Sequence, residues 1–359
     1  MVGLVFIGNI EYCPYLEKYE NILEELKLEY EVLFWNRDGE KKQYPDSYVY
    51  FNKKSHLKIN KFYKLNGFLQ YSIWLKNKIR KRRYSKLIIL DTLSGIILSD
   101  VLLNIYSKNY IFDIRDYSYE KVPFFLAIEE KIIKKSYFTC ISSDGFKDFL
   151  PKGYNYITTH NFSYSDLSIK KKELSKKKKY GDTLDFVWIG SIRFFNHQVE
   201  IINKLKNDDR FNIIYHGIGP DYEALKEYCS NNCIDNVKFT GLYVNSDRPK
   251  LLLNVDILNN SYGTQDEMQT KYLISNRYYD GLIFKIPQLV EINSYKNTKI
   301  KEAGVGIGID IYSDKFNDDL YKYYFEIDEK SFNEGCNAEL NKIIKEDKIY
   351  INKIEQFLM

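Results

Sequence analysis

The stretch from Ser275 to Pro287 reads SNRYYDGLIFKIP and combines groups that could hold a charged ligand. If it forms a helix, Asn276, Arg277 and Asp280 share one face, because residues three or four apart are neighbours on a helix. A guanidinium fork can bind phosphate oxygens, and a carboxylate can accept both hydroxyl protons of a vicinal diol. Ser275 or Asn276 could also cap the helix and direct free backbone N–H groups at an anion. The segment therefore indicates a ligand with an anionic end and a diol end.

A surface ion pair is the competing interpretation of this segment. Arg277 and Asp280 would then form an i,i+3 pair on a solvated face, and on the segment alone that interpretation is favoured. Glycines at strand ends shift the balance, because glycine lets backbone approach a ligand closely. We expect a nucleotide diphosphate at one sheet edge, beside Gly190, Gly217, Gly219 and Gly241.

The elements that must position these residues alternate between strand-like and helix-like patterns. Apolar runs typical of buried strands cover 2–8, 30–35, 47–51, 86–90, 110–114 and 137–142, and then 184–189, 212–216, 237–240, 257–259 and 288–290. Segments with helical periodicity separate many of them, among others 15–28, 61–83 and 122–135. Such alternation predicts parallel sheets with helices on both faces, and ligands bind beyond the carboxyl ends of such strands.

The 359 residues suffice for two domains. We expect a first Rossmann-like domain over 1–165, a polar, lysine-rich linker over 166–183 and a second Rossmann-like domain over 184–336. A C-terminal segment, 337–359, reads as one or two amphipathic helices that could pack back on the first domain. The fold class is therefore α/β, with two doubly wound domains facing across a cleft.

An ordered set of motifs over 184–310 resembles the C-terminal half of glycosyltransferases of the GT-B fold, specifically family 4. The set comprises Gly190 with Arg193, Gly217 to Pro220, Val237 to Gly241, and Asn276 to Pro287. The resemblance implies a retaining hexosyltransferase that moves a sugar from a nucleotide-diphosphate donor, most simply a UDP-sugar. It also implies a saccharide or lipid-linked saccharide acceptor in bacterial surface polysaccharide biosynthesis, such as that of a capsule.

The resemblance also assigns roles to individual residues. Asp280 would hold the donor ribose, and Arg193 and Arg277 would neutralise the donor pyrophosphate as catalytic groups. Gly190, Gly217, Gly219, Gly241 and Asn276 would complete the donor site.

The acceptor is expected to enter from the first domain. Asn9, Arg115 and Asp116 follow strand-like runs there. Asp116 could orient or deprotonate the acceptor hydroxyl; equally, it could pair with Arg115 or cap a turn.

Arginines can stabilise a leaving pyrophosphate without a metal ion. No two aspartates lie two residues apart, so the D-x-D metal clamp is missing, although Glu326-x-Asp328 has a permissive spacing. We therefore expect no metal and no cofactor beyond the nucleotide sugar.

The sequence departs from the family pattern at three positions. Tyr272 stands where a first glutamate is usual, Asp280 replaces the second glutamate, and His197 stands near the place of a lysine. The missing first glutamate keeps one alternative function open, a non-catalytic, degenerate transferase that acts as a binding partner. A nucleotide-sugar epimerase of similar architecture is a second alternative. Of the other histidines, His216 is expected to be a packed or backbone-bonded residue rather than a catalytic base. His160 is expected to face the cleft.

The charge pattern indicates partners other than nucleic acid. Net charge is only +4, but six of the eight residues of 76–83 are Lys or Arg, and 170–179 contains seven lysines. Such clusters can bind anionic headgroups at about 1 kcal/mol per charge. We expect a cytoplasmic protein with peripheral contact at the inner face of the cell membrane.

Overall fold

The structure is a computed structural model that describes all residues except 41, 56–60, 163, 169–173, 175–177 and 264–266. It divides into two compact units. Unit 1 contains residues Met1–Asn161 and Lys345–Met359, and unit 2 contains residues Phe162–Ile344. Most of the lysine-rich segment 170–179 lies outside the described residues.

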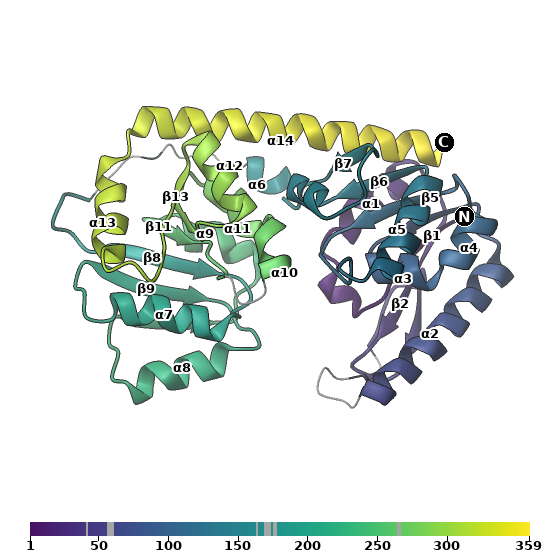
Figure 1. Ribbon diagram of the computed structural model, residues 1–359, viewed down its shortest axis with the longest axis horizontal. Helices are drawn as coiled ribbons and strands as arrows, with labels where there is room; N and C mark the ends of the chain where they lie inside the picture. Colours follow the sequence, from purple (N-terminus) through teal and green to yellow (C-terminus); the bar gives the residue numbers. More distant parts are fainter. Residues whose placement is uncertain (41, 56–60, 163, 169–173, 175–177, 264–266) are drawn as a thin grey trace. The chain divides into compact units, whose positions relative to one another are not determined.

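Unit 1 is built on a parallel sheet, which has seven strands among the described residues, in the order β3-β2-β1-β4-β5-β6-β7 (Figure 1). The first strand lies inside the sheet, as in a doubly wound fold. The central strands are apolar and buried on both faces, as expected for a parallel sheet. The strands are β1 (Val2–Phe6), β2 (Tyr30–Asn36), β3 (Tyr48–Asn52), β4 (Lys86–Ile89), β5 (Tyr110–Ile114), β6 (Phe138–Ile141) and β7 (Tyr156–Thr158).

Helices cover both faces of this sheet. Side chains of α1 pack on one face of the sheet, in the same core as Leu4 and Ile88. On the other face, an added Cβ at Gly67 of α2 would lie 2.7 Å from the Trp35 ring, so this helix packs closely on β2. The helices of unit 1 are α1 (Leu16–Glu25), α2 (Lys61–Arg82), α3 (Thr92–Ile97), α4 (Ser99–Asn104) and α5 (Pro123–Lys135), with short 3-10 turns at Ile10–Tyr12 and Asp144–Asp148.

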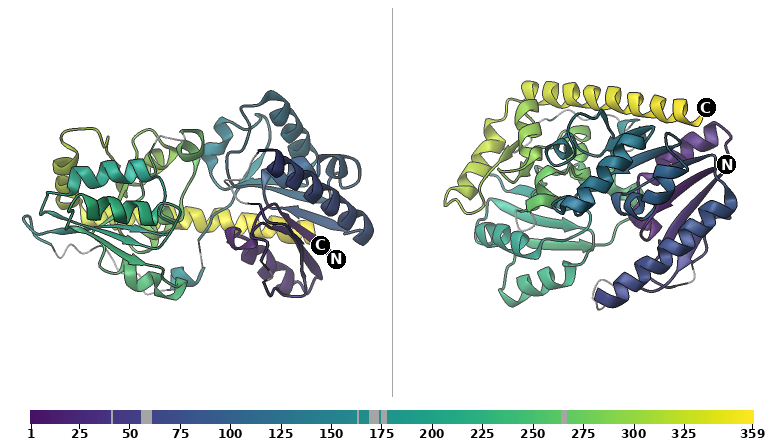
Figure 2. Two further views of the ribbon diagram at one scale, coloured as in Figure 1. Left: turned by 90° about the horizontal axis from the view of Figure 1, so that it is seen from below. Right: turned by 45° about the vertical axis from the view of Figure 1, so that its right-hand side comes forward.

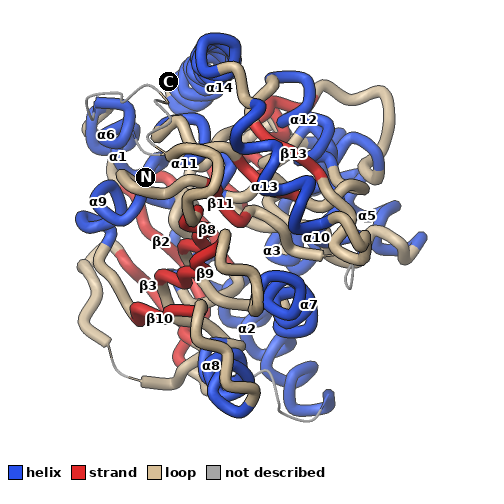
Figure 3. The backbone as a smooth tube through the Cα atoms, turned by 90° about the vertical axis from the view of Figure 1, so that its left-hand side faces the viewer, coloured by secondary structure: helices blue, strands red, loops and turns tan. Residues whose placement is uncertain are grey.

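Unit 2 repeats this architecture with a parallel sheet that, in the described part of the chain, has six strands in the order β10-β9-β8-β11-β12-β13 (Figure 3). Its strands are β8 (Leu184–Ile189), β9 (Phe211–His216), β10 (Val237–Gly241), β11 (Ile257–Asn259), β12 (Gln288–Val290) and β13 (Gly306–Gly308). Its helices are α6 (Tyr164–Ser168), α7 (Phe195–Leu205), α8 (Tyr222–Asn231), α9 (Arg248–Leu252), α10 (Glu267–Tyr272), α11 (Asn276–Ile283), α12 (Tyr295–Ala303) and α13 (Phe316–Glu326), with a 3-10 turn at Asn245–Asp247.

Alternate residues of β8 serve two different cores. Phe186 and Trp188 pack with residues of α7, α8 and α13, whereas Ile189 packs with Leu252 of α9 on the opposite face. β8 lies in the middle of the sheet, and the loop that follows it lies at the carboxyl edge of the strands. Ligands of parallel sheets bind at this edge. The prediction of two doubly wound α/β domains is confirmed.

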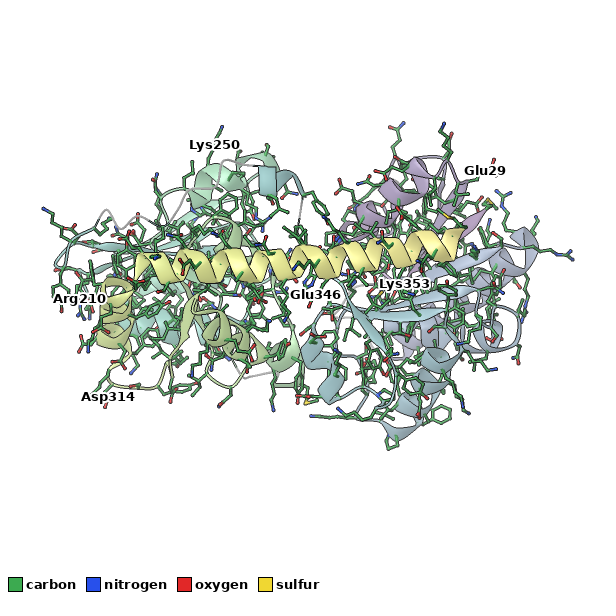
Figure 4. The ribbon with its side chains drawn as sticks, turned by 90° about the horizontal axis from the view of Figure 1, so that it is seen from above. Glu29, Arg210, Lys250, Asp314, Glu346 and Lys353 are labelled. Carbon is green, nitrogen blue, oxygen red and sulfur yellow. The ribbon has the colours of Figure 1, made fainter. Side chains whose placement is uncertain are left out.

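The C-terminal segment forms one unbroken helix, α14 (Glu329–Leu358), rather than two (Figure 2). Its first half contributes Phe332, Cys336 and Leu340 to a core of unit 2. Its last part contributes Tyr350 and Phe357 to the core of unit 1. The helix therefore belongs to both units, and its middle carries the labelled Glu346 (Figure 4).

Candidate functional site

Glycines end three neighbouring strands of unit 2 in a left-handed backbone conformation. Gly190, Gly217 and Gly241 have φ angles of +111°, +120° and +77°. The N–H of Gly190 donates to His216 O at 3.0 Å, and the N–H of Gly217 donates to Gly241 O at 2.9 Å. The structure thus brings these three glycines together at the carboxyl edge of β8, β9 and β10, as expected.

Side chains could not fit at two glycines of the loops that follow these strands. A Cβ at Gly217 would lie 2.3 Å from Gly190 O, and a Cβ at Gly219 would lie 2.3 Å from Ile192 O. The loops after β8 and β9 therefore pack backbone against backbone. At Gly190 and Gly241, by contrast, a Cβ would meet nothing closer than 3.8 Å and 3.9 Å, so the missing side chain leaves the main chain open there.

Arg277 lies beside this edge and is buried, with 4% of its surface exposed. Its Nη1 donates to Ile189 O at 2.9 Å, and its guanidinium stacks 3.5 Å from the centre of the Trp188 ring. Its Nε and Nη2 are buried and have no hydrogen-bond partner among the described residues. Burial lowers the pKa of Arg277, and neighbouring Arg193 lowers it further. The guanidinium is thus held rigidly and keeps unused donors.

A group of cations surrounds the ring of Tyr262. Arg277 lies 4.7 Å, Lys296 4.0 Å and Arg193 5.9 Å from the ring centre. Burial raises the pKa of Tyr262, but these three cations outweigh it and leave that pKa below its usual value. Lys296 is itself buried and pairs with Glu291 at 3.1 Å. The site therefore has an excess of positive charge, which suits an anion such as a diphosphate.

Asp280 is also buried, on the same helix as Arg277, with 2% of its surface exposed. Its Oδ1 accepts a charged hydrogen bond from Arg248 Nη2, and its Oδ2 is buried with no partner within the described ranges. Arg248 also approaches Asp166 at 3.6 Å. A solvated i,i+3 pair between Arg277 and Asp280 is therefore the wrong interpretation: both residues are buried, and Asp280 pairs with Arg248.

The helix cap differs from the expectation. Ser275 occupies the N-cap position of α11, but its side chain makes no capping bond and donates to Asn260 Oδ1 instead. Asn276 is exposed in the first turn of the helix. The hydroxyl thus fixes the preceding loop rather than the helix end.

The three histidines in the described part of the chain contact protein groups, whereas His56 lies outside the described residues. His216 Nδ1 lies 2.8 Å from Thr240 Oγ1, which fits the packed role expected for it. His160 Nε2 lies 2.8 Å from Glu346 Oε2 within unit 1. His197 Nε2 lies 2.7 Å from Ser261 Oγ, and burial lowers the pKa of His197 to about 4. His197 is therefore neutral near pH 7 and cannot replace a lysine as a cation.

The residues expected to meet an acceptor lie after β1 and β5 of unit 1, in different environments. Asn9 is buried and bonds Asp38 and the N–H of Arg37. Arg115 is buried, pairs with Asp113 at 2.6 Å and stacks on Tyr15. Asp116 is exposed. Asn9 and Arg115 thus shape the loops, and Asp116 is the one that reaches solvent.

Sequence reasoning missed several residues of the site: Trp188, Tyr262, Arg248, Asp166, Lys296 and Glu291. Arg248 precedes a proline in a polar loop, and Lys296 lies in a polar helical segment, so neither pattern differs from an ordinary surface. Glu291 directly follows β12, and this strand-end position was the one available signal. The described residues contain no group of three His, Cys, Asp or Glu side chains that could hold a metal ion.

Comparison with solved structures identifies the architecture. Sucrose-phosphate synthase of Thermosynechococcus elongatus superimposes with a TM-score of 0.66 at 8% identity, covering 99% of this chain and 95% of that one. WaaG, a glycosyltransferase involved in lipopolysaccharide biosynthesis, gives 0.65 at 12% identity, with 99% of each chain covered. The chain has the GT-B fold. HepE of Anabaena, solved with UDP and glucose, gives 0.62 at 11% identity, with 99% of each chain covered. No protein-family model and no curated protein sequence matches the chain.

Proposed function

We propose that this GT-B protein is a glycosyltransferase that takes its sugar from a nucleotide-diphosphate donor bound in unit 2. The observation that carries the proposal is a pair of unsatisfied groups on α11. Arg277 keeps two buried nitrogens without a partner, and Asp280 keeps one buried oxygen without a partner, in the described part of the chain. Unpaired buried polar groups are costly, so their presence beside a glycine-lined edge indicates that they bind a ligand.

The chemistry follows from the charges of the site. When the bond between the sugar and the diphosphate breaks, negative charge grows on the diphosphate. The acceptor hydroxyl gives its proton to the departing diphosphate as its oxygen bonds the sugar. Arg277 and Arg193 would stabilise that charge, Arg277 most strongly because it is buried and fixed against Trp188. Asp280 Oδ2 would accept the ribose hydroxyls. This assignment needs no metal ion, so activity should persist in EDTA.

We further propose a UDP-hexose as donor and a saccharide or lipid-linked saccharide of a bacterial surface polysaccharide as acceptor, with retention of configuration. HepE, whose structure contains UDP and glucose, supports the choice of donor by similarity of fold, and WaaG, which is involved in lipopolysaccharide biosynthesis, supports the choice of acceptor in the same way. Retention of configuration is proposed from the motif resemblance alone. In unit 1, Asp116 is the exposed carboxylate beyond β5 and would orient the acceptor hydroxyl.

A thermal-shift screen against UDP, GDP, ADP, CDP and dTDP tests the donor site. A ligand present at a hundred times its Kd should add about 2.7 kcal/mol of stability. Asp280→Ala should abolish the response to the nucleotide that binds. A folded wild type that responds to none of the five would refute the proposal. Binding with epimerised donor as product would identify an epimerase, and binding without any turnover a non-catalytic module.

We also propose peripheral contact of unit 1 with an anionic membrane, through α2. Leu65, Leu69 and Ile73 recur every four residues along this helix and are 60%, 56% and 61% exposed. Lys81 and Arg83 are exposed at its C-terminal end. An apolar stripe that continues into exposed cations suits the headgroup region of an anionic bilayer. Among the described residues, no helix is long and apolar enough to cross a membrane.

Vesicle co-sedimentation tests this contact with wild type and two variants. Binding to vesicles with 30 mol% anionic lipid should fall when Lys81 and Arg83 are replaced by Glu, and also when Leu69 and Ile73 are replaced by Ser. Neutral vesicles serve as the control. Unchanged binding of both variants to the anionic vesicles would remove the membrane contact from the proposal.

A further inference from the structure

Asp280 is a carboxylate with one oxygen occupied and one open. Arg248 bonds Oδ1, and Oδ2 is buried without a partner as far as the chain is described. We propose that Arg248 is a positioning residue of the donor site, which fixes the Asp280 carboxylate in its ionised form so that Oδ2 faces the donor hydroxyls. This inference rests on the proposed function, because it concerns the same site.

Arg248 is held in a way that suits such a role. It is the first residue of α9, directly after the 3-10 turn Asn245–Asp247, and Pro249 follows it in the first turn of the helix. Its guanidinium lies between two carboxylates, with Asp280 bonded to one nitrogen and Asp166 3.6 Å from another. A planar guanidinium bound to two anions has little freedom to turn, so the orientation of the Asp280 carboxylate is defined as well.

The charges around Asp280 show why it needs a cation. Arg248 of α9, Asp166 of α6 and Arg277 of its own helix face it, and Tyr243 lies near Arg248. Burial raises the pKa of Asp280, and Arg248 is the largest influence that opposes burial. Asp166 raises the same pKa and Arg277 lowers it less. Without Arg248, a buried Asp280 would therefore hold a proton more readily and would lose acceptor capacity for a diol.

A direct blocking role for Arg248 is the alternative to a supporting one. If Arg248 occupied the place of the ribose, its removal would tighten nucleotide binding. The free Oδ2 and the second anchor at Asp166 favour support, because a blocking residue would have to leave both carboxylates when the donor arrives. The two roles thus predict changes of opposite sign.

Isothermal titration calorimetry with the nucleotide diphosphate that binds best among UDP, GDP, ADP, CDP and dTDP tests the inference between pH 6.5 and 9. The proteins are wild type, R248M, R248K and the control K250M, whose side chain is exposed on the same helix (Figure 4). The ratio of variant to wild-type Kd at each pH cancels the titration of the nucleotide itself. We expect R248M to weaken binding by about tenfold to a hundredfold at pH 6.5, with recovery towards wild type as the pH rises. K250M should match wild type throughout.

The other outcomes are equally definite. A loss for R248M that is the same at every pH, or tighter binding, would overturn the positioning role while leaving the donor site intact. A wild type that binds none of the five nucleotides would overturn both the inference and the proposed function. Should R248M fail to fold, R248K decides: it should bind more weakly than wild type but with the wild-type pH profile, and equal or tighter binding would overturn the inference.

Discussion

Arg277 is both charged and buried, and burial disfavours the charged form. The contacts of its guanidinium explain how a charged side chain is accommodated there. A buried cation without a carboxylate partner is unfavourable, but stacking on an aromatic ring can recover about 2 kcal/mol when the cation is desolvated. The guanidinium lies 3.5 Å from the Trp188 ring centre, and one nitrogen donates to a main-chain carbonyl. The remaining donors, Nε and Nη2, have no partner among the described residues and are the ones that we propose for the diphosphate.

Replacing Arg277 by Lys keeps the charge and removes the planar stack and the bond to Ile189 O. We expect Arg277→Lys to lower the free energy of unfolding by about 1–3 kcal/mol and to weaken nucleotide binding at least tenfold. Denaturant unfolding and calorimetry measure the two effects. Arg193→Lys, at an exposed position near the same ring, should leave stability unchanged. Full nucleotide affinity of Arg277→Lys would exclude Arg277 from the diphosphate site.

His197 should make stability depend on pH. Burial lowers its pKa from 6.5 to about 4, so the unfolded chain binds more protons between these values. Stability is therefore lost as the pH falls from 6.5 through 4, by on the order of 3 kcal/mol for this group. The difference between wild type and His197→Gln, measured by urea unfolding at pH 7 and pH 4.5, isolates that contribution. A difference that does not change with pH would show that His197 titrates normally.

At the scale of elements, the carboxyl edge of the sheet in unit 2 depends on glycine backbone. Gly217 has a φ of +120°, and the space for its Cβ is already filled by Gly190 O at 2.3 Å. The strand-end loops can therefore approach each other only without side chains. This close approach, rather than flexibility, explains the glycine at this position.

The variant Gly217→Ala should lose more than about 2 kcal/mol of stability, because strain in φ and a backbone clash add. Nucleotide binding should be lost with it. Gly304→Ala is the matched control: Gly304 is left-handed at a φ of +67°, but a Cβ there meets nothing within 4 Å. It should cost only about 1 kcal/mol. Thermal unfolding of both variants measures the difference, and equal losses would show that φ alone is responsible.

At the scale of the whole molecule, α14 contributes to the cores of both units. Its last part places Tyr350, Ile354 and Phe357 in the core of unit 1, and Lys18 pairs with Asp347 at 2.7 Å. Each fully buried apolar side chain of this kind stabilises by roughly 1.5–3 kcal/mol. The end of the chain is therefore a structural part of the first unit.

Truncating Phe357 tests that role. Phe357→Ala should destabilise unit 1 by about 3–5 kcal/mol, the usual cost of a large-to-small change in a core. Met359→Ala, at a residue that is 86% exposed, should change stability little. Because the proposed donor site lies in unit 2, nucleotide binding should survive in Phe357→Ala at temperatures where the chain is folded. Chemical unfolding measures the stability, and calorimetry measures nucleotide binding. Unchanged stability or lost binding would contradict this role of α14.

Much of the fold followed from local pattern. Apolar runs, some of them ending at a glycine, predicted the strands, and their alternation with helical periodicity predicted parallel, doubly wound sheets. The same periodicity placed Arg277 and Asp280 on one helix face, and the strand-end glycines were expected at one edge. These features depend on backbone conformation and side-chain period, which neighbouring residues determine.

The tertiary structure alone decided which groups meet and how deeply they are buried. It paired Asp280 with Arg248, drew Lys296 and Arg277 around Tyr262, and left His197 neutral. These outcomes depend on contacts between residues far apart in the chain and on the loss of water around them. The pKa of a side chain, and so its charge, is set only when both are known. The sequence by itself therefore determined the elements and the edge where a ligand would bind, while packing determined the charge and orientation of the groups that would hold it.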